Sequence, residues 1–144
     1  MVGRRVLGIG LDPYTIDFAS EFFQGKPLRA DIIASGIKAD EQRIRGMGHD
    51  FEWLLIDGRG GAAKASAAVR AALARRPVDV VVIGGGVRLD PAQTPALEAL
   101  VNAVIEAAPG ARIGFNTSPT DTAEAIGRGL TAWIPRLRDG ERGI

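Results

Sequence analysis

Small, polar and charged residues follow each of four apolar segments, and they are the residues of this chain best suited to bind a ligand. The candidate site residues are Gly10, Asp12, Asp57, Gly84, Gly85, Gly86, Arg88, Asn116, Thr117 and Ser118. Ligands of open α/β sheets bind at the carboxyl ends of the strands. If the four apolar segments are parallel strands, these residues therefore meet at one edge of a sheet.

The three consecutive glycines Gly84, Gly85 and Gly86 are the strongest single signal. Glycines permit left-handed backbone angles and let a ligand approach the chain closely. Arg88 follows on the same side of the expected sheet, where a guanidinium can pair with a phosphate or a carboxylate. The alternative is a turn that needs glycine for its backbone angles alone.

Amide and hydroxyl groups precede the last expected helix, at Asn116, Thr117 and Ser118. Such groups cap helices, and they also bind anions. Capping is the better explanation for Ser118 and for Asp121, which leaves Asn116 and Thr117 available to a ligand.

Two carboxylates, Asp12 and Asp57, end the first and second expected strands. If those strands are neighbours, they lie roughly 5 Å apart, so their carboxylates can share Mg²⁺ or one can act as a general base. In the alternative interpretation each carboxylate caps a loop, since Asp-Pro commonly opens a turn. The sequence assigns neither a metal ion nor a cofactor.

Two glycine-rich segments differ from the nucleotide-binding motifs that they resemble. Pro13 stands where the dinucleotide fingerprint G-x-G-x-x-G needs its third glycine. Ala63 and Ala65 replace the second glycine and the hydroxyl residue of the phosphate-binding loop G-x-x-x-x-G-K-[ST]. The only histidine, His49, precedes the second strand, so we expect it on the surface at the opposite edge of the sheet.

The elements that position these residues alternate between strand and helix. Unbroken apolar runs predict strands over residues 5–11, 51–57, 78–84 and 111–116. Apolar residues at helical spacing predict helices over residues 28–47 and 62–76, one that ends before Pro109 and one that ends before Pro135. This alternation predicts an α/β fold: a three-layer doubly wound sandwich around a four-stranded parallel sheet in the order 2-1-3-4.

The connection over residues 12–27 is too long for a simple turn. It holds four aromatic residues, among them Phe22, and we expect either a lid over the site or, as the alternative, a satellite core or a subunit contact. Asp40 interrupts the apolar stripe of the helix that follows. It must pair with an arginine, or a bend at Gly36 shifts the stripe, because an unpaired buried carboxylate is costly.

The layout resembles the flavodoxin-like doubly wound class, which includes flavodoxins and response-regulator receiver domains. Flavodoxins hold phosphate with a Ser/Thr-rich loop after strand 1, where this chain has Asp12-Pro13-Tyr14. The acidic pair after strand 1 and the late lysine of receivers have no counterpart here. The resemblance therefore implies the fold and no particular activity.

Length and composition predict one domain over residues 1–144, with a loose tail over 136–144. A net charge of +1 gives no indication of nucleic-acid binding, and the absence of cysteine excludes disulfides and thiolate chemistry. No apolar segment is long enough to cross a membrane. We expect a cytoplasmic protein and, because a small sheet has two edges to cover, a homodimer.

These residues together predict a domain that binds a small anionic molecule, a phosphate or a carboxylate, at the carboxyl ends of strands 1, 3 and 4. Asp12 and Asp57 are the candidate catalytic residues if the protein is an enzyme. The alternative is a non-catalytic, receiver-like regulatory or protein-interaction domain. It would use the aromatic connection or the last helix, with Trp133 and Ile134 partly exposed, as its contact surface.

Overall fold

A four-stranded parallel sheet forms the centre of the computed structural model, which describes residues 4–118 and 120–131. The strands are β1 (Arg5–Leu11), β2 (Asp50–Ile56), β3 (Val80–Ile83) and β4 (Arg112–Phe115). Their order is β2-β1-β3-β4, which confirms the predicted order. This order places β2 on one side of β1 and β3 on the other, so the topological switch point lies between β1 and β3. These two strands are parallel neighbours, paired from Val6 opposite Val80 onward.

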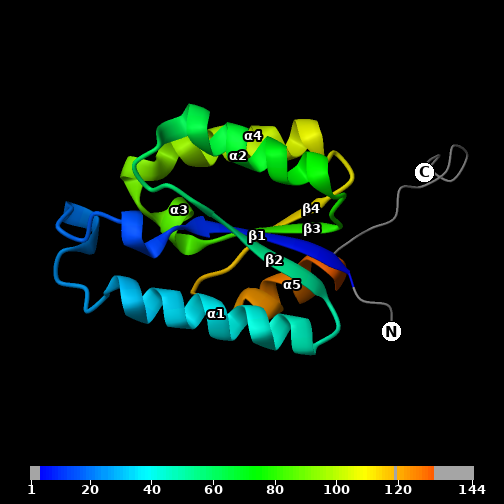
Figure 1. Ribbon diagram of the computed structural model, residues 1–144, viewed down its shortest axis with the longest axis horizontal. Coiled ribbons are helices and arrows are strands. Elements are labelled where there is room, and N and C mark those ends of the chain that lie inside the picture. The colour runs from blue at the N-terminus through cyan, green and yellow to red at the C-terminus, as the bar shows by residue number, and fades with distance from the viewer. Residues whose placement is uncertain (1–3, 119, 132–144) are drawn as a thin grey trace, which may run out of the picture.

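Helices cover both faces of this sheet. They are α1 (Ala30–Gly46), α2 (Gly61–Arg75), α3 (Gly85–Leu89), α4 (Thr94–Ala107) and α5 (Thr122–Thr131). Figure 1 shows α2 and α4 on one face and α1 and α5 on the other, so the molecule is a three-layer, flavodoxin-like α/β sandwich. Within residues 4–118 and 120–131, no helix is both long and apolar enough to cross a membrane.

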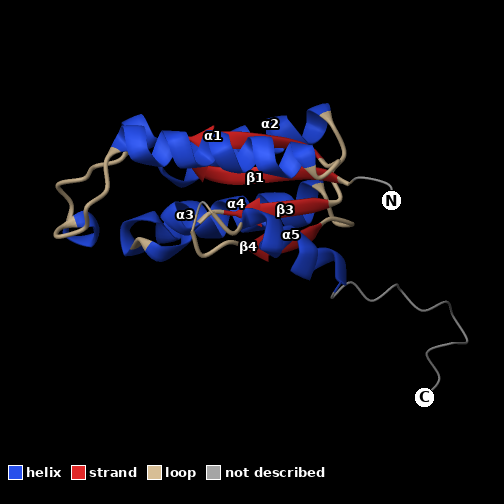
Figure 2. Ribbon diagram, turned by 90° about the horizontal axis from the view of Figure 1, so that it is seen from below, coloured by secondary structure: helices blue, strands red, loops and turns tan. Residues whose placement is uncertain are grey.

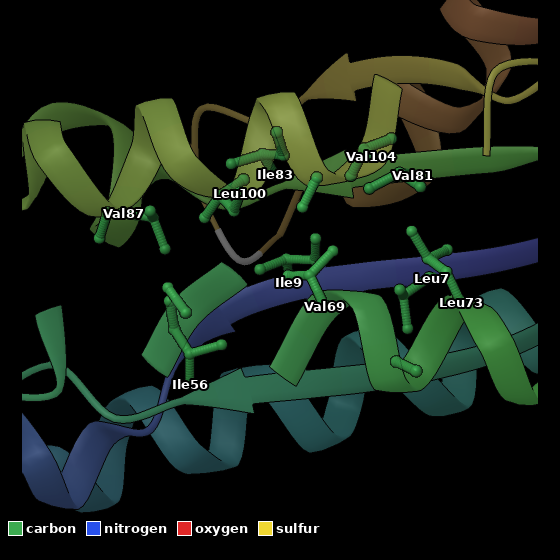
Figure 3. Packing of buried hydrophobic residues seen from close by; sticks show 14 of the residues in the cluster. Leu7, Ile9, Ile56, Val69, Leu73, Val81, Ile83, Val87, Leu100 and Val104 are labelled. Atoms are coloured by element: carbon green, nitrogen blue, oxygen red, sulfur yellow. The ribbon is translucent and has the colours of Figure 1, made fainter. Parts of the chain in front are cut away.

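The larger hydrophobic core lies between the sheet and the pair α2–α4 (Figure 3). Alternate residues of β1, Leu7 and Ile9, point to this face because successive strand side chains point to opposite sides. Val69 of α2 and Leu100 of α4 meet them, and both are fully buried. The apolar spacing that predicts helices in these two segments is therefore confirmed.

The smaller core lies under α1 and α5, and it depends on a glycine in β1. Val6, Ile44 and Phe51 are buried there. The rings of Phe51 and Trp53 meet edge to face, with their centroids 5.3 Å apart, next to Gly8. A Cβ atom at Gly8 would lie 2.6 Å from Trp53 Cε3, so the missing side chain makes room for both rings.

The connection from β1 to α1 is less regular than a helix. It contains two single-turn 3₁₀ helices, η1 (Pro13–Thr15) and η2 (Glu21–Phe23). Figure 2 shows that it projects beyond the end of the sheet at which α3 lies. Tyr14 is 71% exposed, so it contributes nothing to the core.

Two further expectations have a different outcome, and a third is not tested. Helix α3 begins directly after β3, where only a glycine loop was expected, and a short 3₁₀ turn, η3 (Pro91–Gln93), links α3 to α4. The helix predicted over residues 28–47 ends at Gly46, and Met47 caps it and is half exposed. Trp133, Ile134 and the tail over residues 136–144 lie outside the described residues.

Candidate functional site

A cavity of about 350 Å³ lies at the carboxyl edge of the sheet, beside the switch point between β1 and β3. Its lining residues are Gly10, Leu11, Ile16, Phe22, Phe23, Lys26, Leu28, Ile33, Ile37, Gly84, Gly85, Gly86, Leu89, Asn116, Thr117 and Ser118. The sequence-based candidates Gly10, Gly84, Gly85, Gly86, Asn116, Thr117 and Ser118 are thus brought together. Asp12, Asp57 and Arg88 are not among the lining residues.

Apolar side chains from three segments form most of the wall. The connection after β1 supplies Phe22 and Phe23, the first turns of α1 supply Ile33 and Ile37, and α3 supplies Leu89. Phe23 is 7% exposed, and the Phe22 ring packs edge to face against it at 4.9 Å between centroids. A concave, mainly apolar wall with a few polar groups is typical of small-molecule sites.

The glycines after β3 leave space rather than form a left-handed turn. None of Gly84, Gly85 and Gly86 has a positive φ. A Cβ atom at Gly84 would lie 3.2 Å from the Ile9 carbonyl oxygen, so glycine lets the end of β3 approach β1. At Gly86 a Cβ atom would meet Leu11 Cδ1 at 3.6 Å, an ordinary contact. The fold therefore has room for a Cβ atom at residue 86, where glycine lines the cavity.

Asn116 connects the glycine segment to α5 through a buried network. Its Oδ1 accepts a hydrogen bond from the Gly85 amide at 3.0 Å, and its Nδ2 donates to Thr122 Oγ1 at 2.9 Å. Asn116 is 2% exposed, and Thr122 is fully buried. Both ends of the Asn116 amide are occupied, so this side chain positions the cavity floor.

Arg88 points to the end of β4 rather than into the cavity. Its Nη2 donates to the Asn116 carbonyl oxygen at 2.7 Å, and its guanidinium carbon lies 5.4 Å from the centroid of the Phe115 ring. The guanidinium therefore holds the chain after β4 in place.

The amides of Thr117 and Ser118 already bind a carboxylate of the chain itself. They donate to Asp121 Oδ1 at 2.9 Å and 3.1 Å, and the Thr117 hydroxyl donates to Oδ2. Burial raises the pKa of Asp121, but the hydrogen bonds from Thr117 and Ser118 outweigh burial and hold that pKa below its usual value. Asp121 thus occupies these donors as an anion at neutral pH.

The two candidate catalytic carboxylates both act as loop caps. Asp12 Oδ1 accepts a hydrogen bond from the Tyr14 amide at 3.0 Å. Asp57 accepts hydrogen bonds from Lys64 Nζ and from the Arg59 amide, each at 2.9 Å, and these bonds lower its pKa. Among residues 4–118 and 120–131, no group of three or more acidic, histidine or cysteine side chains could hold a metal ion.

The opposite, amino edge of the sheet has a second hollow, of about 410 Å³, whose charges pair with one another. Arg5 Nε lies 3.4 Å from Asp50 Oδ2, and the Arg5 amide donates to Asp79 at 2.9 Å. His49 lies at this edge as predicted, but it is buried rather than on the surface. Its Nδ1 accepts a hydrogen bond from the Arg4 amide, which explains why it is covered.

Sequence reasoning missed one charged residue of the cavity. Lys26 is the sole charged side chain among the lining residues, and its Nζ lies 3.3 Å from the centroid of the Phe22 ring. The connection that carries Lys26 has no periodic pattern that would predict its position. The one signal in the sequence was the spacing of this lysine, four residues after Phe22.

Asp40 pairs with an arginine, which is one of the two explanations given for its position on the apolar stripe. Its carboxylate is 3% exposed and accepts a hydrogen bond from Arg43 Nη2 at 2.7 Å. Burial raises the pKa of Asp40, and the Thr122 hydroxyl and the Arg43 guanidinium partly offset that rise. Asp40 therefore lies close to Thr122, the residue that accepts the hydrogen bond from Asn116.

Comparison with known proteins adds no functional information to this geometry. The chain matches no protein-family model, no curated protein and no solved structure.

Proposed function

We propose that this protein binds a small molecule with a largely apolar body in the cavity at the carboxyl edge of the sheet. The observation that carries the proposal is the cavity itself, about 350 Å³ of space walled by apolar side chains at the switch point. This volume is at the lower end of the range for ligand pockets, roughly 300–1,000 Å³. At about 30 Å³ for each water-sized unit, it accommodates roughly a dozen non-hydrogen atoms.

The glycine at residue 86 supports this proposal independently of the cavity volume. Glycine within a helix destabilises it by roughly 0.5–1 kcal/mol relative to alanine. Gly86 lies in α3, has no positive φ and has room for a Cβ atom. The fold alone gives no reason for a glycine at residue 86, whereas space for a ligand does.

A catalytic role has less support. Asp12 and Asp57 cap loops and do not line the cavity, and the polar donors after β4 are engaged by Asp121. No observation favours a receiver-like regulatory role, because this chain has no counterpart of the acidic pair that receivers carry after strand 1. The connection over residues 12–27 contributes Ile16, Phe22 and Phe23 to the wall, which favours its role as a lid over a subunit contact.

A titration of the labelled protein with decanol, a neutral probe of suitable size, tests this proposal. We expect the backbone amide signals of Gly85, Gly86 and Leu89 to shift on addition of decanol. Gly86→Leu should weaken binding at least about tenfold, since a leucine side chain that fills the site displaces apolar contacts worth roughly 1.5–3 kcal/mol. Gly110→Leu adds the same side chain in open space before β4 and serves as the matched control.

Urea unfolding of both variants establishes that each remains folded during the titration. Decanol binding that Gly86→Leu leaves unchanged, or amide shifts that fall outside the cavity, would show that the proposed site is wrong.

A further inference from the structure

The charges around the cavity restrict the ligand that it can hold. Its lining residues include one cation, Lys26, and no aspartate or glutamate. None of the ion pairs formed among residues 4–118 and 120–131 includes Lys26. A ligand with an ammonium group would meet a lysine and no counter-ion, whereas an anionic ligand would meet its only charged partner.

The position of Lys26 indicates where an anionic group would sit. Its Nζ lies 3.3 Å from the centroid of the Phe22 ring, and Phe22 itself lines the cavity. The ammonium group has three donors, and a ring face engages it without a hydrogen-bonding carboxylate. It is therefore held at the wall with donors available to an anion.

The remaining polar groups argue against a phosphate. A phosphate dianion needs several donors, yet the Gly85 amide donates to Asn116, and the Thr117 and Ser118 amides donate to Asp121. Asp121 also places a negative charge directly behind those two amides. A single cation among the lining residues suits a monoanion better than a dianion.

We propose that the cavity binds a small amphipathic carboxylate, whose apolar body lies against the wall of Phe23, Ile33 and Ile37 and whose carboxylate pairs with Lys26. This inference rests on the proposed function of the cavity. It names the ligand class, an alkyl or aryl carboxylate of roughly a dozen non-hydrogen atoms. Lys26 is the residue that selects the carboxylate over a neutral analogue.

Four probes with one chain length and different head groups test this inference by calorimetry and amide shifts at low salt. They are decanoate, decanol, decylamine and decyl phosphate. We expect decanoate to bind tightest, about two- to fivefold tighter than decanol, since an exposed ion pair contributes roughly 0.2–1 kcal/mol. Lys26→Met, which keeps an unbranched apolar stem over Phe22, should remove this difference, so that decanoate and decanol bind this variant equally.

Lys38→Met provides the matched control, because Lys38 is an exposed lysine of α1 that does not line the cavity. It should preserve the preference for decanoate. Equal binding of decanoate and decanol to the unmodified protein, or tighter binding of decylamine or decyl phosphate, overturns the assignment of a carboxylate and leaves the cavity as a binding site. If none of the four probes shifts the cavity amides, the proposed function itself fails.

Discussion

Gly8 offers a quantitative test of how closely the sheet packs under α1. In Gly8→Ala, the new methyl group would lie 2.6 Å and 2.8 Å from two Trp53 ring atoms and 2.9 Å from Phe51 Cζ. Ordinary contacts begin near 3.4 Å, and two rigid rings that already pack edge to face cannot both retreat. Such overpacking costs about 1–3 kcal/mol. The replacement of glycine by alanine offsets about 0.4–1 kcal/mol of this cost, because it lowers the conformational entropy of the unfolded chain.

We therefore expect Gly8→Ala to lower the free energy of unfolding by about 1–2 kcal/mol. Urea unfolding followed by tryptophan fluorescence measures this change directly, and the melting temperature should fall by about 2–8 °C. Gly10→Ala is the matched control, two residues along the same strand, where the nearest side-chain atoms of Leu55 and Trp53 are 3.6 Å away. It should be neutral or slightly stabilising, and equal stabilities for the two variants would refute the packing argument.

The other predictions concern glycines and buried carboxylates, and urea unfolding measures each of them. Gly84→Ala should destabilise the protein because its Cβ atom would press against the Ile9 carbonyl oxygen. Gly86→Ala should stabilise the protein by up to about 1 kcal/mol. A Gly84→Ala variant more stable than Gly86→Ala would contradict the distinct roles given to these glycines. Burial raises the pKa of Asp40 above its usual value of 3.8, so its contribution to stability is fully present below pH 3.8 and is lost as the pH rises through the folded-state pKa. Asp40→Asn should remove that loss. The pKa of Asp121 is lowered from 3.8, so its contribution to stability is present above that pH and is lost as the pH falls through the folded-state pKa. Asp121→Asn should therefore reduce the loss of stability at acidic pH. Parallel pH profiles for the two aspartate variants would contradict the opposite shifts.

Long, strongly patterned segments made the sheet predictable from sequence. Val80–Ile83 is an unbroken β-branched run, typical of a strand buried on both faces, and all four residues are fully buried. Helix α3 was not predictable, because Gly85 and Gly86 are poor helix formers. It forms where Val87 packs into the larger core, a tertiary contact that no local pattern reveals.

The candidate site was predictable only in part. Strand ends located the edge of the sheet and gave seven lining residues, because parallel strands bring their carboxyl ends together. Local patterns could not reveal which polar groups were already engaged, such as the Thr117 amide that Asp121 occupies. Ile33 and Ile37 read as an ordinary core stripe, yet they line the cavity because α1 begins beside the carboxyl edge.

A crystal structure of the protein with 9-bromononanoate gives the strictest test of a carboxylate site in this cavity, since the anomalous signal of bromine locates the probe. We expect a bromine position within the cavity, against Phe23 and Ile33, and a carboxylate within about 4 Å of Lys26 Nζ, the limit for an ion pair. A bromine position outside the cavity would overturn the proposed site, as would a crystal grown with the probe in which the cavity holds only water.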